Sequence, residues 1–180
     1  MTDPQATRSW VADLVRSALC SEDVVRDQAV AAIESDHPDL PAAETAAAWI
    51  AEAHRAWHED AATWPDVTDH DRLLEAFAAL EQHGIVVLQG IADHWVARDE
   101  LLRRTPKPAG VAWFTPTDVW HAIDAGMLEV NLWHASTANA APGDRLLDEA
   151  IEAFAAAGLD AHFDEGRIEV KARWQRRPGT

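Results

Sequence analysis

Residues 113–134 read WFTPTDVWHAIDAGMLEVNLWH, and they predict a short helix between two strands. Thr115 stands where an N-cap belongs, Pro116 takes the first helical position, and Asp118 follows three residues after the cap. This combination is typical of a helix start, so it needs no catalytic explanation. Gly126 is placed to end the helix. The segment therefore predicts an element order of strand, helix, strand.

The strand after Gly126 alternates between two faces. Its apolar face is typical of a protein core and carries Leu128, Val130 and Leu132. The opposite face carries Glu129, Asn131 and Trp133. Trp133 either packs beneath the N-terminal helices or lines a surface that binds a partner, and the sequence leaves both alternatives open.

A second polar face belongs to the C-terminal strand, in GRIEVKARWQRR (166–177). Alternation places Lys171 and Arg173 on its basic side. We therefore predict a partner-binding set of Trp133, Glu129, Asn131, Lys171 and Arg173. The alternative is that these basic residues pair with acids of the same chain.

The rest of the C-terminal part alternates helices and strands. Thr68 and Asp71 predict a capped helix that ends at Gly84, and IVVLQ (85–89) predicts a buried strand. A helix over 93–104, a strand VAWF (111–114), a helix after Gly143 and a hairpin over 159–174 complete the order. The fold class is α+β: an antiparallel or mixed sheet of about five strands with helices mainly on one face, as a ferredoxin-like variant.

The first sixty residues predict three helices with Ala-rich apolar stripes. Pro65 ends this pattern in ATWPDVTDHDR (62–72). We expect a helical N-terminal segment over 1–64 and an α+β domain over 65–180, or one compact unit that includes both. Cys20 continues the apolar stripe of the first helix, and we expect its thiol to be buried and inert.

Composition limits the classes of function. The net charge of −16 argues against nucleic-acid binding, which depends on clustered Lys and Arg. One cysteine excludes an intrachain disulfide and a cysteine-based zinc site. We find no signal peptide, no membrane span and no cofactor motif, so we expect a cytoplasmic protein without a cofactor.

His54 and His58 are the strongest metal candidates. They lie four residues apart on the third helix, so both rings project to one side, a spacing that suits a transition metal. A third ligand is not evident at helical spacing, and the glutamate of the zinc-protease pattern is missing.

The chain resembles a bacterial family of uncharacterised proteins, known as a domain of unknown function. The likeness rests on SEDVV, LPAAE, the junction TWP-x-x-TD-x-DRL, the helix ending in HGIVV, and AFAAAGLDAHFDEGRIEV. Many members carry clustered cysteines after the strand that corresponds to 85–89, whereas this chain reads QGIADHWVARDE there. The resemblance implies a fold and no activity.

These observations predict a cytoplasmic, non-enzymatic interaction or regulatory protein whose partner is an unknown protein. The alternative is a metal-binding protein or a metal-dependent enzyme with a histidine and carboxylate site among His54, His58, His94 and nearby acids. The oligomeric state and the identity of a substrate or partner stay open.

Overall fold

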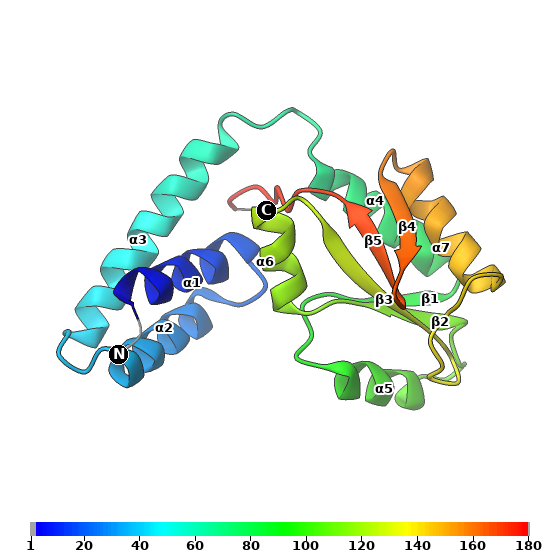
Figure 1. The fold of residues 1–180 in the computed structure, drawn as a ribbon, viewed down its shortest axis with the longest axis horizontal. Helices are drawn as coiled ribbons and strands as arrows, with labels where there is room; N and C mark the ends of the chain where they lie inside the picture. The colour runs from blue at the N-terminus through cyan, green and yellow to red at the C-terminus, as the bar shows by residue number, and fades with distance from the viewer. Residues whose placement is uncertain (1–2, 180) are drawn as a thin grey trace. The chain divides into compact units, whose positions relative to one another are not determined.

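The computed structural model describes residues 3–179 and divides them into two compact units. The helical unit comprises the residues up to Pro65 together with 176–179. The sheet unit comprises Asp66–Gln175. Figure 1 shows three helices in the first unit, and a sheet with its own helices in the second.

The helical unit consists of α1 (Pro4–Ser17), α2 (Glu22–Asp36) and α3 (Ala42–Ala61), so the three predicted helices are confirmed. Asp3 caps α1 by accepting a hydrogen bond from the backbone N–H of Gln5, and Ser21 caps α2 in the same way through Val24. The small core at one end of the unit has Val11, Ala29, Ile33 and Ala46 at its centre. Partly buried Trp10 and Trp49 pack around this core, along with other apolar side chains.

The last described residues are tied to the helical unit through backbone carbonyls. Arg176 donates to the carbonyl of Ala18 at the end of α1 (2.8 Å), and Arg177 donates to Ala61 at the end of α3 (3.4 Å). Trp57 in turn donates from Nε1 to the carbonyl of Arg176 (2.9 Å). Guanidinium groups suit helix C-termini because the exposed carbonyls carry partial negative charge.

The sheet unit contains four helices and five strands among the described residues. In chain order they are α4 (Asp69–Gln82), β1 (Ile85–Leu88), α5 (His94–Arg103), β2 (Gly110–Trp113), α6 (Pro116–Asp124), β3 (Leu128–His134), α7 (Arg145–Ala156), β4 (Asp160–Asp164) and β5 (Arg167–Lys171). The strand order is β1-β2-β3-β5-β4. β1 and β2 are parallel, and the other pairs are antiparallel.

This architecture confirms the α+β class and the mixed sheet of five strands. The predicted hairpin is β4–β5, with its turn at Glu165 and Gly166. The sheet differs from that of a ferredoxin-like fold in one respect. A split βαβ unit has a strand between its two parallel strands, whereas β1 and β2 are direct neighbours here.

Helices cover both faces of the β1–β2 part of the sheet. A Cβ atom added at Gly110 would lie 2.9 Å from Leu146 of α7, so the Gly110 face is the α7 face. Val111, the next residue, points to the other face and packs with Ala97 and Leu101 of α5. Figure 1 shows α5 on one side of the sheet, while α4 and α7 lie on the opposite side.

Aromatic side chains dominate the core of the sheet unit. Phe77 of α4 stacks on Phe114 (ring centroids 5.7 Å apart) and meets Phe154 of α7 edge-on (6.2 Å). Phe114 also contacts the ring of Trp174 at 5.9 Å. Phe114 and Phe154 have no exposed surface, and each such burial stabilises the fold by roughly 1.5–3 kcal/mol.

The polar residues at the start of α4 have structural roles. Thr68 and Asp71 form a reciprocal capping box, which the sequence predicted. Asp69 accepts a hydrogen bond from the backbone N–H of Arg173 (3.1 Å), and His70 meets the ring of Trp174 edge-on at 4.7 Å. Arg72 donates to the carbonyl of Gly158 (3.2 Å). This junction therefore holds α4 to the ends of β5 and α7.

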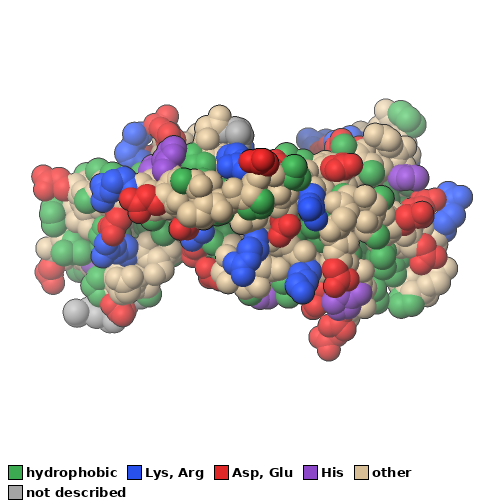
Figure 2. All heavy atoms as spheres, turned by 90° about the horizontal axis from the view of Figure 1, so that it is seen from above, with side chains coloured by type: hydrophobic (Ala, Val, Ile, Leu, Met, Phe, Trp, Pro, Cys, Tyr) green, Lys and Arg blue, Asp and Glu red, His purple; other side chains and the backbone are tan. Residues whose placement is uncertain are grey.

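The surface mixes charges of both signs. Acidic and basic side chains are interspersed on the face that Figure 2 draws. Several of the basic groups pair with nearby acids, such as Arg16 with Asp60 (3.1 Å) and Arg145 with Glu149 (3.2 Å). Within residues 3–179, no helix has the length and apolar character needed to cross a membrane.

Candidate functional site

Trp133, the centre of the predicted partner-binding set, lies against α5. Its ring meets Trp113 of β2 edge-on with centroids 5.4 Å apart, and His94 at the start of α5 lies 6.4 Å away. Trp133 is partly buried against the cluster that includes Val111 and Leu101. The sequence left two positions open for this ring, and neither included the short helix α5.

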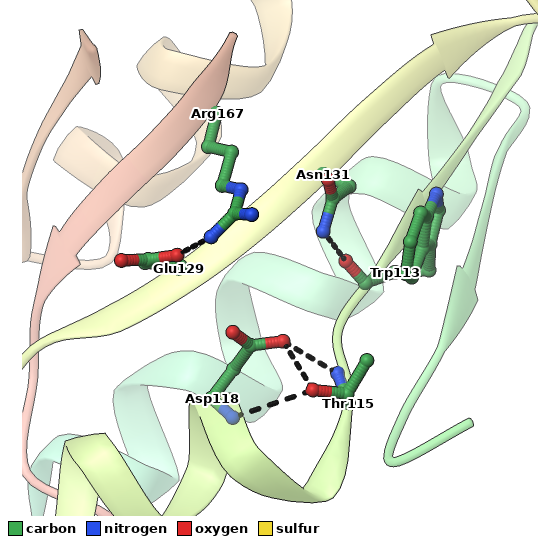
Figure 3. A network of polar contacts seen from close by, with 6 residues as sticks. All are labelled: Trp113, Thr115, Asp118, Glu129, Asn131 and Arg167. Atoms are coloured by element: carbon green, nitrogen blue, oxygen red, sulfur yellow. Dashed lines mark hydrogen bonds and ion pairs between the residues drawn. The ribbon is translucent and has the colours of Figure 1, made fainter. Parts of the chain in front are cut away.

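The polar members of the predicted set make contacts within the sheet unit. Glu129 forms an ion pair with Arg167 on the neighbouring strand β5, and Asn131 donates from Nδ2 to the carbonyl of Trp113 (3.5 Å). Figure 3 shows both contacts, together with the capping box of Thr115 and Asp118 at the start of α6. These side chains are thus engaged in holding neighbouring strands together.

The two basic members lie at the C-terminal end of the sheet unit. The register places Lys171 on the same face as Glu129, and its side chain is exposed. Arg173 lies beyond the end of β5, with its side chain beside Gly126. The structure therefore gathers Glu129, Asn131 and Trp133 on one strand face, and a partner-binding role for the set stays a prediction.

The outer face of α5 was not predicted as a candidate. Trp95 is 58% exposed and Leu102 is 52% exposed, and their separation of seven residues places both on one side of the helix. Ala97 and Leu101 face the sheet instead. The helix is thus apolar on two sides, of which only one has a partner within the described residues. We call Trp95, Val96, Arg98 and Leu102 the α5 outer face.

Basic side chains surround the α5 outer face. The guanidinium of Arg98 lies over the ring of Trp95, with Cζ 5.8 Å from the ring centroid. Arg103 and Arg104 both bind Glu100, and their hydrogen bonds hold the pKa of that carboxyl below its ordinary value. Residues 94–107 contain four basic and two acidic side chains in a chain of net charge −16. The neighbourhood of α5 is therefore locally positive.

A cleft of about 720 Å³ opens in the helical unit, beside its core. One stripe of α3 lines it with Ala47, Ile50, Ala51, His54 and His58. Other apolar walls come from Val15 of α1, from Ala18 just after that helix, from Val25 of α2 and Trp57 of α3, and from Pro178. Cys20, Glu22 and Arg26 contribute polar groups. We call this the helical-unit cleft.

Both predicted metal ligands, His54 and His58, line the helical-unit cleft. The ring of His54 lies 6.0 Å from that of Trp57. Across residues 3–179, no three His, Cys, Asp or Glu side chains come together in a group that could hold a metal ion. A metal role for the two histidines stays a prediction from their spacing.

The prediction of a buried thiol at Cys20 was wrong, because the side chain is exposed. The apolar stripe of α1 stops at Ser17, where Ala18 adopts a left-handed conformation (φ 49°) and redirects the chain. Cys20 therefore belongs to the loop before α2 and lines the cleft.

The loop between β3 and α7 contains a side-chain pair, His134 with Asp144. His134 Nε2 lies 2.9 Å from the carboxylate of Asp144, which also accepts a hydrogen bond from the backbone N–H of Ala141 (2.8 Å). The bond with His134, followed by the one from Ala141, lowers the pKa of the Asp144 carboxyl. The pair positions the start of α7 and has no further titratable partner in the described interactions.

Comparisons with known proteins give a family and no activity. No curated protein and no solved structure matches the chain. A family model described as a domain of unknown function, DUF6891, matches residues 2–178. Because this match spans nearly the whole sequence, the chain belongs to the DUF6891 family.

Proposed function

We propose that the chain is a cytoplasmic, non-enzymatic interaction or regulatory protein, and that the α5 outer face binds a protein partner. The observation that carries the proposal is the exposure of Trp95 and Leu102 on a helix whose other side is already buried. Large apolar side chains exposed together are unusual on a soluble surface, and tryptophan is enriched at the centres of interfaces.

The chemistry of the partner follows from the charges around the α5 outer face. Arg98 stacks on Trp95, and Arg103 and Arg104 share the single carboxylate of Glu100. The partner segment is therefore acidic with apolar anchors, because such a segment covers both tryptophan and leucine and complements the extra guanidinium charge. Trp133 lies beside His94 at the start of α5, and the predicted set around Trp133 forms the secondary part of the same proposal.

The cytoplasmic location rests on composition. The chain has a single cysteine, which is exposed, and it has no disulfide to maintain.

Site-specific photocrosslinking tests the interaction proposal. A photoreactive phenylalanine analogue replaces Trp95 or Leu102 in the full chain, and the protein is irradiated in a lysate of the source cells. Val67 is the matched control position, because it is 58% exposed, as Trp95 is, and lies outside α5. We expect one discrete adduct from positions 95 and 102, absent from position 67, whose crosslinked segment is rich in Asp, Glu and apolar residues.

Three results would contradict the proposal. They are the absence of any adduct at 95 and 102, the same adducts at 67, or a crosslinked segment without acidic character. In a further control, addition of salt to about 0.5 M weakens the adduct, because screening removes the electrostatic part of the attraction.

A further inference from the structure

The helical-unit cleft has the size of a small-molecule site and is independent of the α5 outer face. Its volume of about 720 Å³ lies within the range of ligand pockets, roughly 300–1,000 Å³. Its walls come from all three helices of the unit and from Pro178 and Gly179. The cleft therefore belongs to one compact unit, and a ligand there needs no other part of the chain.

Several of the side chains that line the cleft are small. Ala47 and Ala51 stand one turn apart on α3, and both are exposed although they lie on the side of the helix that turns toward α2. In the neighbouring core of the same unit, Ile33 is fully buried and Trp49 packs against it from α3. Apolar surface that remains open between helices favours an apolar ligand.

The floor of the cleft is buried and hydrogen-bonded. Val15 and Trp57 are each at least nine-tenths buried, and the indole N–H of Trp57 is fixed by the carbonyl of Arg176. Arg176 is itself anchored on Ala18. A preformed floor lowers the cost of ordering the site when a ligand binds.

The polar rim presents more nitrogen donors than carboxylates. Arg26, His54 and His58 offer nitrogen donors, and Glu22 is the one carboxylate that lines the cleft. Arg26 also binds Asp23 (2.5 Å), yet its side chain is 58% exposed and remains accessible to a ligand. Neither His54 nor His58 has a hydrogen bond or ion pair through its ring within the described residues. Their ring nitrogens are therefore available.

We infer that the helical-unit cleft binds a small organic monoanion with an apolar body. The apolar body lies along Ala47, Ile50 and Ala51, and the anionic head meets Arg26 with support from His54 and His58. Carboxylate and sulfonate groups suit this rim, because a guanidinium binds two oxygens of one anion at once.

A fluorescence titration with 8-anilinonaphthalene-1-sulfonate tests this inference on the full chain, because that probe combines an aromatic body with one anionic group. The neutral N-phenyl-1-naphthylamine is the matched uncharged probe. We expect saturable binding of the anionic probe to one site. Ala51→Trp, which fills the cleft, should weaken it by roughly 10-fold or more. Ala48→Trp is the control, since Ala48 is also exposed on α3 but does not line the cleft.

The charge of the ligand is tested separately. Arg26→Gln should weaken binding of the anionic probe by roughly 5-fold and leave the neutral probe unchanged. The inference is overturned if Ala51→Trp binds the anionic probe as the wild type does, if no saturable binding occurs, or if Arg26→Gln affects both probes equally. A thermal melt confirms that each variant is folded, and Ala47→Leu replaces Ala51→Trp if that variant does not fold.

A second copy of the chain is the competing occupant. Sedimentation velocity distinguishes self-association through the cleft from binding of a small organic anion. A wild-type dimer that Ala51→Trp converts to a monomer would assign the cleft to self-association and overturn the ligand inference. A wild type and variant with the same sedimentation coefficient, together with the expected titrations, support the inference.

Discussion

The two units of this chain differ in how their interiors are packed. The sheet unit fills its interior with aromatic rings, and Phe77, Phe114 and Phe154 meet in one cluster. The helical unit builds its contacts from alanine-rich stripes, and an open cleft remains beside its core. Close packing maximises stability, whereas an unfilled apolar space is what a ligand requires. In this chain, a ligand site is therefore expected where close packing stops.

The largest expected effect is the loss of an aromatic ring from the sheet unit. Phe114→Ala removes a side chain with no exposed surface, so we expect a loss of about 3–5 kcal/mol in the free energy of unfolding. Ile50→Ala shortens a partly exposed side chain that lines the cleft. It should lower the free energy of unfolding by about 1 kcal/mol. Urea unfolding measures both values. Equal losses in the two variants would contradict the contrast between the units.

A smaller effect is expected from Gly110→Ala in β2. The added Cβ would lie 2.3 Å from the carbonyl oxygen of Trp133 on the paired strand and 2.9 Å from Leu146. The strand pair must shift to relieve the first contact, because backbone cannot rotate away as a side chain can. We expect a loss of about 1–3 kcal/mol in unfolding free energy. An unchanged denaturation midpoint would show that β2 and β3 are less tightly packed than the structure indicates.

Loss of a helix cap in the sheet unit should have a moderate effect. Thr68→Ala removes the hydroxyl that accepts from the backbone N–H of Asp71, and Thr68 has no exposed surface. The expected cost is about 1–2 kcal/mol of unfolding free energy. Thr63→Ala is the control, because its hydroxyl donates to Asp60 in an exposed turn and should cost less than about 0.5 kcal/mol. Chemical denaturation measures the loss of unfolding free energy in both variants. Equal losses in Thr68→Ala and Thr63→Ala would contradict this assignment.

The smallest expected effect is a pH dependence at Asp144. Because its pKa in the folded chain is lowered, its contribution to stability is present above the ordinary pKa of an aspartate and disappears as the pH falls through the lowered value. Carbon-detected NMR of the carboxyl should show a midpoint below that of a free aspartate. His134→Gln should move the midpoint back toward the ordinary value, because the bond to His134 is the main cause of the shift.

His162→Gln is the control for that titration, since His162 lies 3.5 Å from Glu169 and does not contact Asp144. A midpoint for Asp144 that stays the same in His134→Gln would contradict the assigned cause.

Local patterns predicted much of the fold from the sequence. Capping boxes at Thr68 and Thr115, and the alternation of residues 128–134, act within a few residues, so they are visible in a linear chain. The place of α5 over Trp113 and Trp133 depends on a crossover between β1 and β2, and no local pattern encodes it. The spacing of Trp95 and Leu102 was the available signal for the α5 outer face.

The sequence predicted only part of the helical-unit cleft. The spacing of His54 and His58 indicated one helix side, but the pairing of that side with α2 and the return of residues 178–179 bring together segments far apart in sequence. Cys20 was assigned to the wrong environment because its apolar spacing continues past the residue where α1 ends. Helix ends that have no glycine or proline are hard to locate from pattern alone.

The central claim is that the unfilled cleft of the helical unit is a ligand site, and amide hydrogen exchange tests it most directly. The full chain is exchanged with and without a saturating amount of 8-anilinonaphthalene-1-sulfonate, and protection is mapped by mass spectrometry. We predict slower exchange in residues 18–26 and 47–58 and no change in α5 or the strands of the sheet unit. Protection in the sheet unit, or unchanged exchange in both cleft segments while the probe is bound, would contradict the claim.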